Sequence, residues 1–112
     1  MSMEPNVERT VASLSITTTT LSAGIVVLLM RGTMRRGDID TFRDALTRVQ
    51  RTRPREVQLD FSGLVDVDAG AAAAVTAAAL EAQRTGTAVT VVRASEAVRR
   101  GMTVAGGADM LR

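Results

Sequence analysis

Two carboxylates, Asp66 and Asp68, lie two residues apart and are the strongest candidates for chemistry in this chain. Such a pair can bind a hard cation or share a proton in acid–base catalysis. The sequence places no third carboxylate and no base with them, so we expect Asp68 to cap a helix and Asp66 to be solvated. The absence of cysteine and histidine excludes zinc sites with nitrogen and sulfur ligands, and also Ser-His-Asp and Cys-His catalysis. We therefore expect a protein that is not an enzyme and that has no metal or cofactor.

Three hydroxyl groups, on Ser62, Thr76 and Ser95, are candidates for phosphorylation. Turn and cap roles account for Ser62 and Ser95 without any modification. Thr76 is expected on the exposed side of a helix, where a phosphate would add negative charge to the surface. Thr76 is therefore the hydroxyl to test for this modification.

The elements that must position these residues begin with a hairpin and a helix. Residues 11–23 alternate apolar and small polar side chains and predict a half-exposed strand, while the apolar run at 25–31 predicts a central strand buried on both faces. Asp38 is the expected N-cap of an amphipathic helix that ends before Pro54.

The second half of the chain alternates strands with helices. We expect, in order, a strand at 56–61, a turn at Ser62-Gly63, a crossover at 64–67, an alanine-rich helix at 71–84, a strand at 88–92 and a helix at 95–104. The order β-β-α-β-α-β-α predicts a single α/β domain with a mixed central sheet of about four strands and helices packed against it. The domain is expected to span residues 11–112 after a flexible leader at 1–10.

Composition limits the remaining function classes. Only Phe42 and Phe61 are aromatic, so the core must be aliphatic, and the net charge is only +2. The densest basic run, at 48–55, is better explained as a solvated helix end than as a nucleic-acid site, because no aromatic platform accompanies it. The apolar stretches at 21–30 and 69–80 are shorter than the roughly 20 residues that span a bilayer. With no signal peptide recognisable at the N-terminus, we expect a cytoplasmic protein.

The run VQLDFSGLVDVDAGA at residues 57–71 resembles the core motif of STAS domains. These domains include the anti-sigma factor antagonists and the cytoplasmic tails of sulfate transporters. The family motif is a strand, a glycine turn, a crossover and then Asp-Ser-Ser-Gly at the start of a helix. Gly63 and Asp68 match this motif, and Ala69 falls where the family has its phosphorylated serine. The resemblance covers roughly residues 11–112 and implies a STAS-like fold.

Two further departures from the family pattern concern other parts of the chain. The acidic turn that the family places after Gly32 reads Thr33-Met34-Arg35, so an arginine stands for the usual aspartate. The family's final strand and helix are expected to be cut short after Met110. Such a shortened end could leave a sheet edge open and allow a homodimer.

The resemblance implies a function in protein binding. In the family, the Asp-Ser loop and the following helix dock on a serine-kinase anti-sigma factor, and phosphorylation of the serine breaks the contact. The resemblance therefore implies a bacterial anti-sigma factor antagonist that acts in transcription regulation. We expect it to lack the phosphorylation switch, because the methyl group of Ala69 cannot be phosphorylated. The alternative is an accessory subunit of a transporter assembly that contacts its ATPase, as similar domains without a phosphoacceptor do.

The expected partner-binding surface includes a stripe at helical spacing on the alanine-rich helix, with Leu80 as its apolar anchor. The stripe consists of Ala69, Ala73, Thr76 and Leu80. If the family fold holds, Asp68, Arg35 and Arg36 lie beside it, and the arginines could meet an acidic partner. The alternative is that the alanines simply favour a helix and that the arginines are merely solvated.

Overall fold

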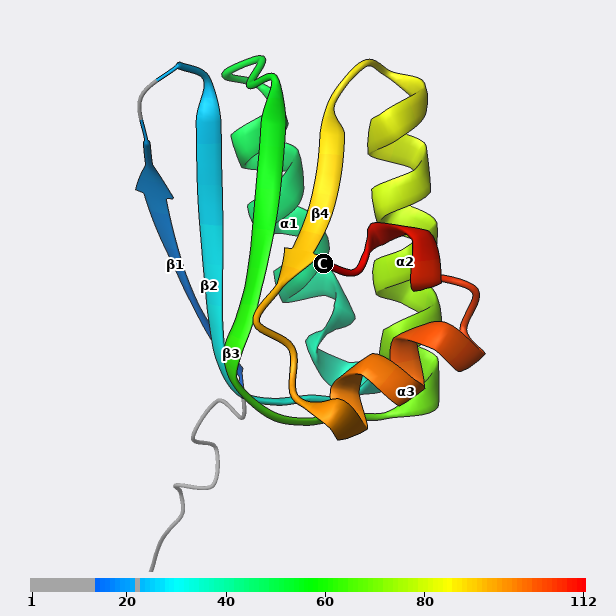
Figure 1. Cartoon of the computed structure of the whole chain (residues 1–112). Coiled ribbons are helices and arrows are strands. Elements are labelled where there is room, and N and C mark those ends of the chain that lie inside the picture. Colours follow the sequence, from blue (N-terminus) through cyan, green and yellow to red (C-terminus); the bar gives the residue numbers. More distant parts are fainter. Residues whose placement is uncertain (1–13, 22) are drawn as a thin grey trace, which may run out of the picture.

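A mixed four-stranded sheet organises the computed structural model, which describes residues 14–21 and 23–112 (Figure 1). The strands are β1 (Leu14–Thr20), β2 (Ile25–Met34), β3 (Glu56–Val67) and β4 (Ala88–Val92), and they lie in the order β1-β2-β3-β4. β1 is antiparallel to β2, whereas β2, β3 and β4 are parallel. The predicted fold class and element order are confirmed. The leader predicted at 1–10, and residues 11–13 of the predicted domain, lie outside the described residues.

Two helices join the parallel strands, and a third follows β4. They are α1 (Ile39–Gln50), α2 (Ala69–Arg84) and α3 (Glu96–Val104), with short 3-10 turns η2 (Arg36–Asp38) and η3 (Ala108–Met110). Asp38 precedes α1 as predicted, but its side chain accepts a hydrogen bond from the Arg35 N–H (2.9 Å) instead of capping the helix. Ser95 caps α3 as predicted, because its hydroxyl oxygen accepts the Val98 N–H.

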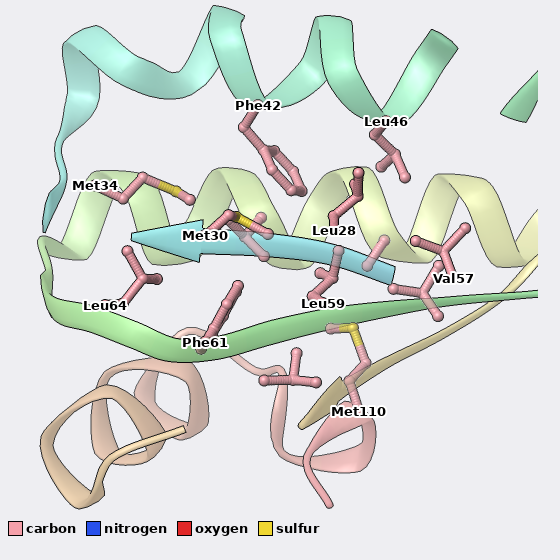
Figure 2. Close-up of a cluster of buried hydrophobic side chains, with 14 of the residues drawn as sticks. Leu28, Met30, Met34, Phe42, Leu46, Val57, Leu59, Phe61, Leu64 and Met110 are labelled. Carbon is pink, nitrogen blue, oxygen red and sulfur yellow. The ribbon is translucent and has the colours of Figure 1, made fainter. Parts of the chain in front are cut away.

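The core lies between one face of the sheet and the helices α1 and α2. The parallel register places Val26 beside Val57 and Leu28 beside Leu59, so alternate residues of neighbouring strands face the same side. All four are buried, and Figure 2 shows Phe42 of α1 pointing into the same cluster. Residues 25, 27 and 29 on the other face are only partly buried. The prediction that β2 is buried on both faces is therefore wrong, because α1 and α2 cover only one face.

The stretch that was expected to turn at Ser62-Gly63 is part of an unbroken β3 strand. The pairing with β2 shifts here, from Leu29–Asp60 to Arg31–Gly63, so an irregularity in the ladder absorbs the extra residue of β3. A Cβ atom on Gly63 would lie 2.7 Å from Arg31 Cγ and 2.9 Å from the Met30 carbonyl oxygen. The glycine is thus needed for close strand contact, and the predicted turn and crossover are wrong.

The C-terminal residues cover part of the sheet edge at β4. Leu111 forms a parallel bridge with Val91, and the Arg112 N–H donates to the Val91 carbonyl (2.9 Å). The Arg112 guanidinium also lies 3.4 Å from the Glu56 carboxylate. The expectation that this end of the chain leaves the edge open is therefore wrong at Val91.

Candidate docking site

Asp68 joins the loops that follow β2 and β3, at the carboxyl end of the parallel strands. Its Oδ1 accepts the Ala71 N–H (2.7 Å), which caps α2 as predicted, and its Oδ2 accepts the Arg36 N–H (3.1 Å). The Asp68 N–H in turn donates to the Met34 carbonyl (3.0 Å). These bonds fix the start of α2 against the loop that leads into η2.

The hydrogen bonds from Ala71 and Arg36 also stabilise the ionised form of Asp68. The hydrogen bond from the Ala71 N–H is the main cause that lowers the pKa of Asp68 below its ordinary value of 3.8. The Arg36 N–H and the guanidinium charges of Arg35 and Arg36 also lower this pKa, and partial burial opposes them. Asp68 is ionised at neutral pH, and its two oxygens accept N–H groups that hold the start of α2 and the loop at Arg36 together. Asp66, which pairs with Thr33 in the ladder, is exposed, as expected.

Arg35 and Arg36 lie beside the Asp68 loop, as the sequence predicted, and both are exposed. The Arg36 side chain extends over the first turn of α2, where a Cβ atom on Gly70 would lie 3.6 Å from Arg36 Nε. Positive charge therefore sits at the end of the domain where α2 begins. An acidic partner surface could approach these guanidinium groups without first displacing buried contacts.

The outward side of α2 carries Ala69, Ala73, Ala77 and Leu80, all of them exposed, and we call this surface the α2 face. Leu80 is 47% exposed, although it is a large apolar side chain. Three of the four residues predicted for this stripe are confirmed as exposed. Ala77 was missed because it and residue 76 both fit the helical spacing from Ala73, so the spacing alone did not separate them.

Thr76 is the predicted site residue that the structure contradicts. It is only 5% exposed, and its hydroxyl donates to the Ala72 carbonyl (2.9 Å). A Cβ atom on Gly107 would lie 2.8 Å from the Thr76 hydroxyl oxygen, so the loop before η3 covers this residue. The buried hydroxyl is not accessible for phosphorylation in the folded domain, and Thr76 is not part of the α2 face.

The part of the chain that the structure describes has neither a cluster of metal-ligating side chains nor a helix that could span a membrane. Within residues 14–21 and 23–112, nowhere do three or more histidine, cysteine, aspartate or glutamate side chains gather in a way that could hold a metal ion. No helix within the same residues has both the length and the hydrophobicity to cross a membrane.

Comparison with known protein families identifies the domain. The family model described as "Mlab, STAS domain" matches residues 17–112. The chain belongs to the STAS domain family. The resemblance of the 57–71 motif to STAS domains is thereby confirmed. No curated protein sequence gives a significant match.

Solved structures share the fold of this STAS domain. The unphosphorylated anti-sigma factor antagonist SpoIIAA superimposes with a TM-score of 0.74 at 13% identity, over 88% of this chain and 86% of that one. An anti-sigma factor antagonist from Mycobacterium paratuberculosis gives a TM-score of 0.73 at 19% identity, over 84% and 79%. The murine anion transporter Slc26a9 gives 0.64 at 15% identity, over 82% of this chain but 18% of the transporter. At these identities the likeness concerns the fold.

Proposed function

We propose that this STAS domain is a non-enzymatic regulatory module that binds a protein partner through the α2 face and the adjoining loops. The observation that carries the proposal is the exposure of Leu80 among alanines on a helix whose first turn is fixed by Asp68. Burying an apolar side chain of this size on binding contributes up to about 2 kcal/mol. The small alanine side chains allow the backbone of α2 to come close to the partner.

Control by phosphorylation is absent from this surface at the position that the family uses. Ala69 is the first residue of α2 and is exposed, so a serine in its place would present a hydroxyl group to a kinase. A methyl group offers no such acceptor. We infer that the partner binds without a switch at residue 69 and that control lies in the abundance of the domain or in the partner itself.

The partner that we propose is a serine-kinase-type anti-sigma factor. In this role the domain is a bacterial, cytoplasmic anti-sigma factor antagonist that acts in transcription regulation. The likeness in fold to two anti-sigma factor antagonists supports this role. The exposed guanidinium groups of Arg35 and Arg36 supply the charge that an acidic surface of the partner would meet.

A second candidate is an accessory subunit that contacts the ATPase of a transporter assembly. The likeness in fold to part of the murine anion transporter Slc26a9 supports it, as does the methyl group of Ala69. Similar domains without a phosphoacceptor are fixed partners of such assemblies. The two candidates share one docking surface and differ in the protein that occupies it.

The test is capture of partners from the native host with the wild-type domain and with Leu80→Asp. Leu21→Asp is the matched control, because Leu21 has nearly the same exposure (45% against 47%) and lies between β1 and β2, whereas α2 packs on β4 at the other side of the strand order. We expect Leu80→Asp to weaken capture at least tenfold, since an uncompensated charge would be placed in the contact. Leu21→Asp should capture as the wild type does.

The identity of the captured protein separates the two candidates. A serine-kinase-type anti-sigma factor supports the antagonist role, and a transporter ATPase supports the accessory role. If Leu80→Asp is folded and captures the same partner as strongly as the wild type, the α2 face is not the docking surface. If Leu80→Asp fails to fold, Leu80 is a core residue, and the proposed face is again wrong.

A further inference from the structure

The outer edge of β1 is a second surface that the proposed function does not use. β1 is the first strand in the sheet order, and no described residue pairs with its outer side (Figure 1). Its sequence, Leu14–Thr20, contains no charged residue and no proline, and its pairing with β2 runs without a register shift. Charges, prolines and bulges are the devices that normally keep free edges from pairing, and β1 has none of them.

We propose that β1 is the contact through which two copies of this chain form a symmetric dimer. The two β1 strands pair in antiparallel orientation and join the two sheets into one. The edge at β4 is less suited to this, because Leu111 and Arg112 already bond to Val91 there. The dimer would not rest on the α2 face, since α2 packs on β4 and β1 lies at the other end of the strand order.

The backbone groups required for this pairing point outward from β1. The Leu21 N–H donates to the Ile25 carbonyl (2.8 Å), which makes residues 21 and 25 a hydrogen-bonded pair at the end of the hairpin. In antiparallel ladders such pairs alternate, so Thr19, Thr17 and Ser15 direct their backbone groups toward β2. The N–H and C=O groups of Thr20, Thr18 and Ile16 must then face outward, where a second strand can accept and donate hydrogen bonds.

A groove beside this edge leaves room for the side chains of a second strand. It has a volume of about 350 Å³ and lies between β1 and α1, lined by Thr18, Thr20, Val26, Ala45, Arg48, Val49 and Thr52. A strand added to β1 would place every second side chain on this side of the sheet. In a second copy of β1 the side chains on this face that are not already buried in their own core are Ile16, Thr18 and Thr20, and none of them is charged.

The symmetry of the dimer fixes the register. A two-fold axis perpendicular to the sheet requires that residues opposite each other point to the same face. The axis must therefore pass between the two copies of one residue, so that this residue is opposite itself. Full overlap of the two strands places Thr17 on the axis and Ser15 opposite Thr19. Since Thr17 directs its backbone groups toward β2, its new partner forms a non-hydrogen-bonded pair, in which side chains are closest.

The test is sedimentation velocity of the purified chain over a range of concentrations. We expect weak self-association, with a Kd between about 10 µM and 1 mM, because one pair of strands buries little area. Thr17→Lys and Thr17→Glu should each weaken it at least tenfold, since like charges would meet on the axis. Mixing the two variants should restore association to at least the wild-type level, which only a contact at residue 17 explains.

Two controls make the outcome decisive. Thr103→Lys adds the same charge on α3, where the side chain is exposed, and should associate as the wild type does. Circular dichroism should show both Thr17 variants folded, because Thr17 is exposed. The proposal is overturned if the wild type stays monomeric at about 1 mM, if Thr17→Lys associates like the wild type, or if mixing the folded variants restores nothing.

Discussion

The carboxylate of Asp68 connects the start of α2 to the loop at Arg36, because its two oxygens accept hydrogen bonds from different segments. Oδ1 satisfies an N–H group of the first turn of α2, and Oδ2 holds the N–H of Arg36. Groups that bond to the ionised form lower a carboxyl pKa, and the same bonds therefore couple stability to pH. The residue at the centre of the candidate site is in this way also part of the fold.

The pH dependence of unfolding should report this role. Because the pKa of folded Asp68 lies below 3.8, its charge stabilises the fold fully above that ordinary value, and the contribution is lost as the pH falls through the lowered pKa. In Asp68→Asn the amide oxygen can still cap α2, but nothing ionises. We expect the wild type to lose more stability than Asp68→Asn between about pH 5 and pH 3 in urea unfolding. Equal losses would show that the carboxylate contributes no charge effect.

Ala69 offers a substitution that separates folding from docking. Ala69→Glu places a negative charge at the first residue of α2, where the helix dipole favours it by about 0.3–1 kcal/mol. We expect an unfolding free energy equal to or above that of the wild type, together with partner binding at least tenfold weaker. Ala69→Ser, which is small and neutral, is the matched control and should bind within about threefold of the wild type. Full binding by Ala69→Glu would remove residue 69 from the interface.

At the scale of elements, β3 shows how a glycine can be taken for a turn. Ser62-Gly63 has turn-forming residue types, yet the strand continues because Gly63 lets β2 come close and the ladder shifts register. The Ser62 N–H donates to the Asp60 carboxylate (2.9 Å), which uses part of the backbone that the shift leaves unpaired.

Substitution at Gly63 should test this account. In Gly63→Ala the new Cβ would meet a backbone oxygen of β2 at 2.9 Å, so the strands must separate. We expect a loss of about 1–3 kcal/mol in the unfolding free energy, measured by chemical denaturation. Gly37→Ala is the control, because a Cβ there meets nothing within 4 Å, and it should change stability by less than about 0.5 kcal/mol. Similar effects at both positions would contradict the close-contact role of Gly63.

For the whole molecule, the docking site and the proposed dimer contact use separate elements of the sheet order. The α2 face belongs to a helix that packs on β4, whereas the dimer contact is the outer side of β1. The two proposals therefore fail independently. Leu80→Asp should leave self-association unchanged, and Thr17→Lys should leave partner capture unchanged. Loss of both properties in a single folded variant would mean that the two surfaces are coupled.

The sequence by itself determined the class of the fold, the order of strands and helices along the chain and the N-cap of α2, although α2 begins at Ala69 and not at Ala71 as expected. Alternation of strands with amphipathic helices and the N-cap preference of Asp68 are local properties, and local spacing reveals them. The same is true of the exposed positions Ala69, Ala73 and Leu80, which follow from helical periodicity.

Tertiary structure decided what local patterns leave open. α2 carries alanine on its buried and exposed sides alike, so periodicity could not assign Thr76, which the loop at Gly107 covers. The continuity of β3 depends on its contact with β2, and the open face of β2 depends on where α1 and α2 pack. The closure of β4 at Val91 depends on Leu111, 20 positions along the chain. Each of these features is a contact between distant segments, which residue spacing along one element does not encode.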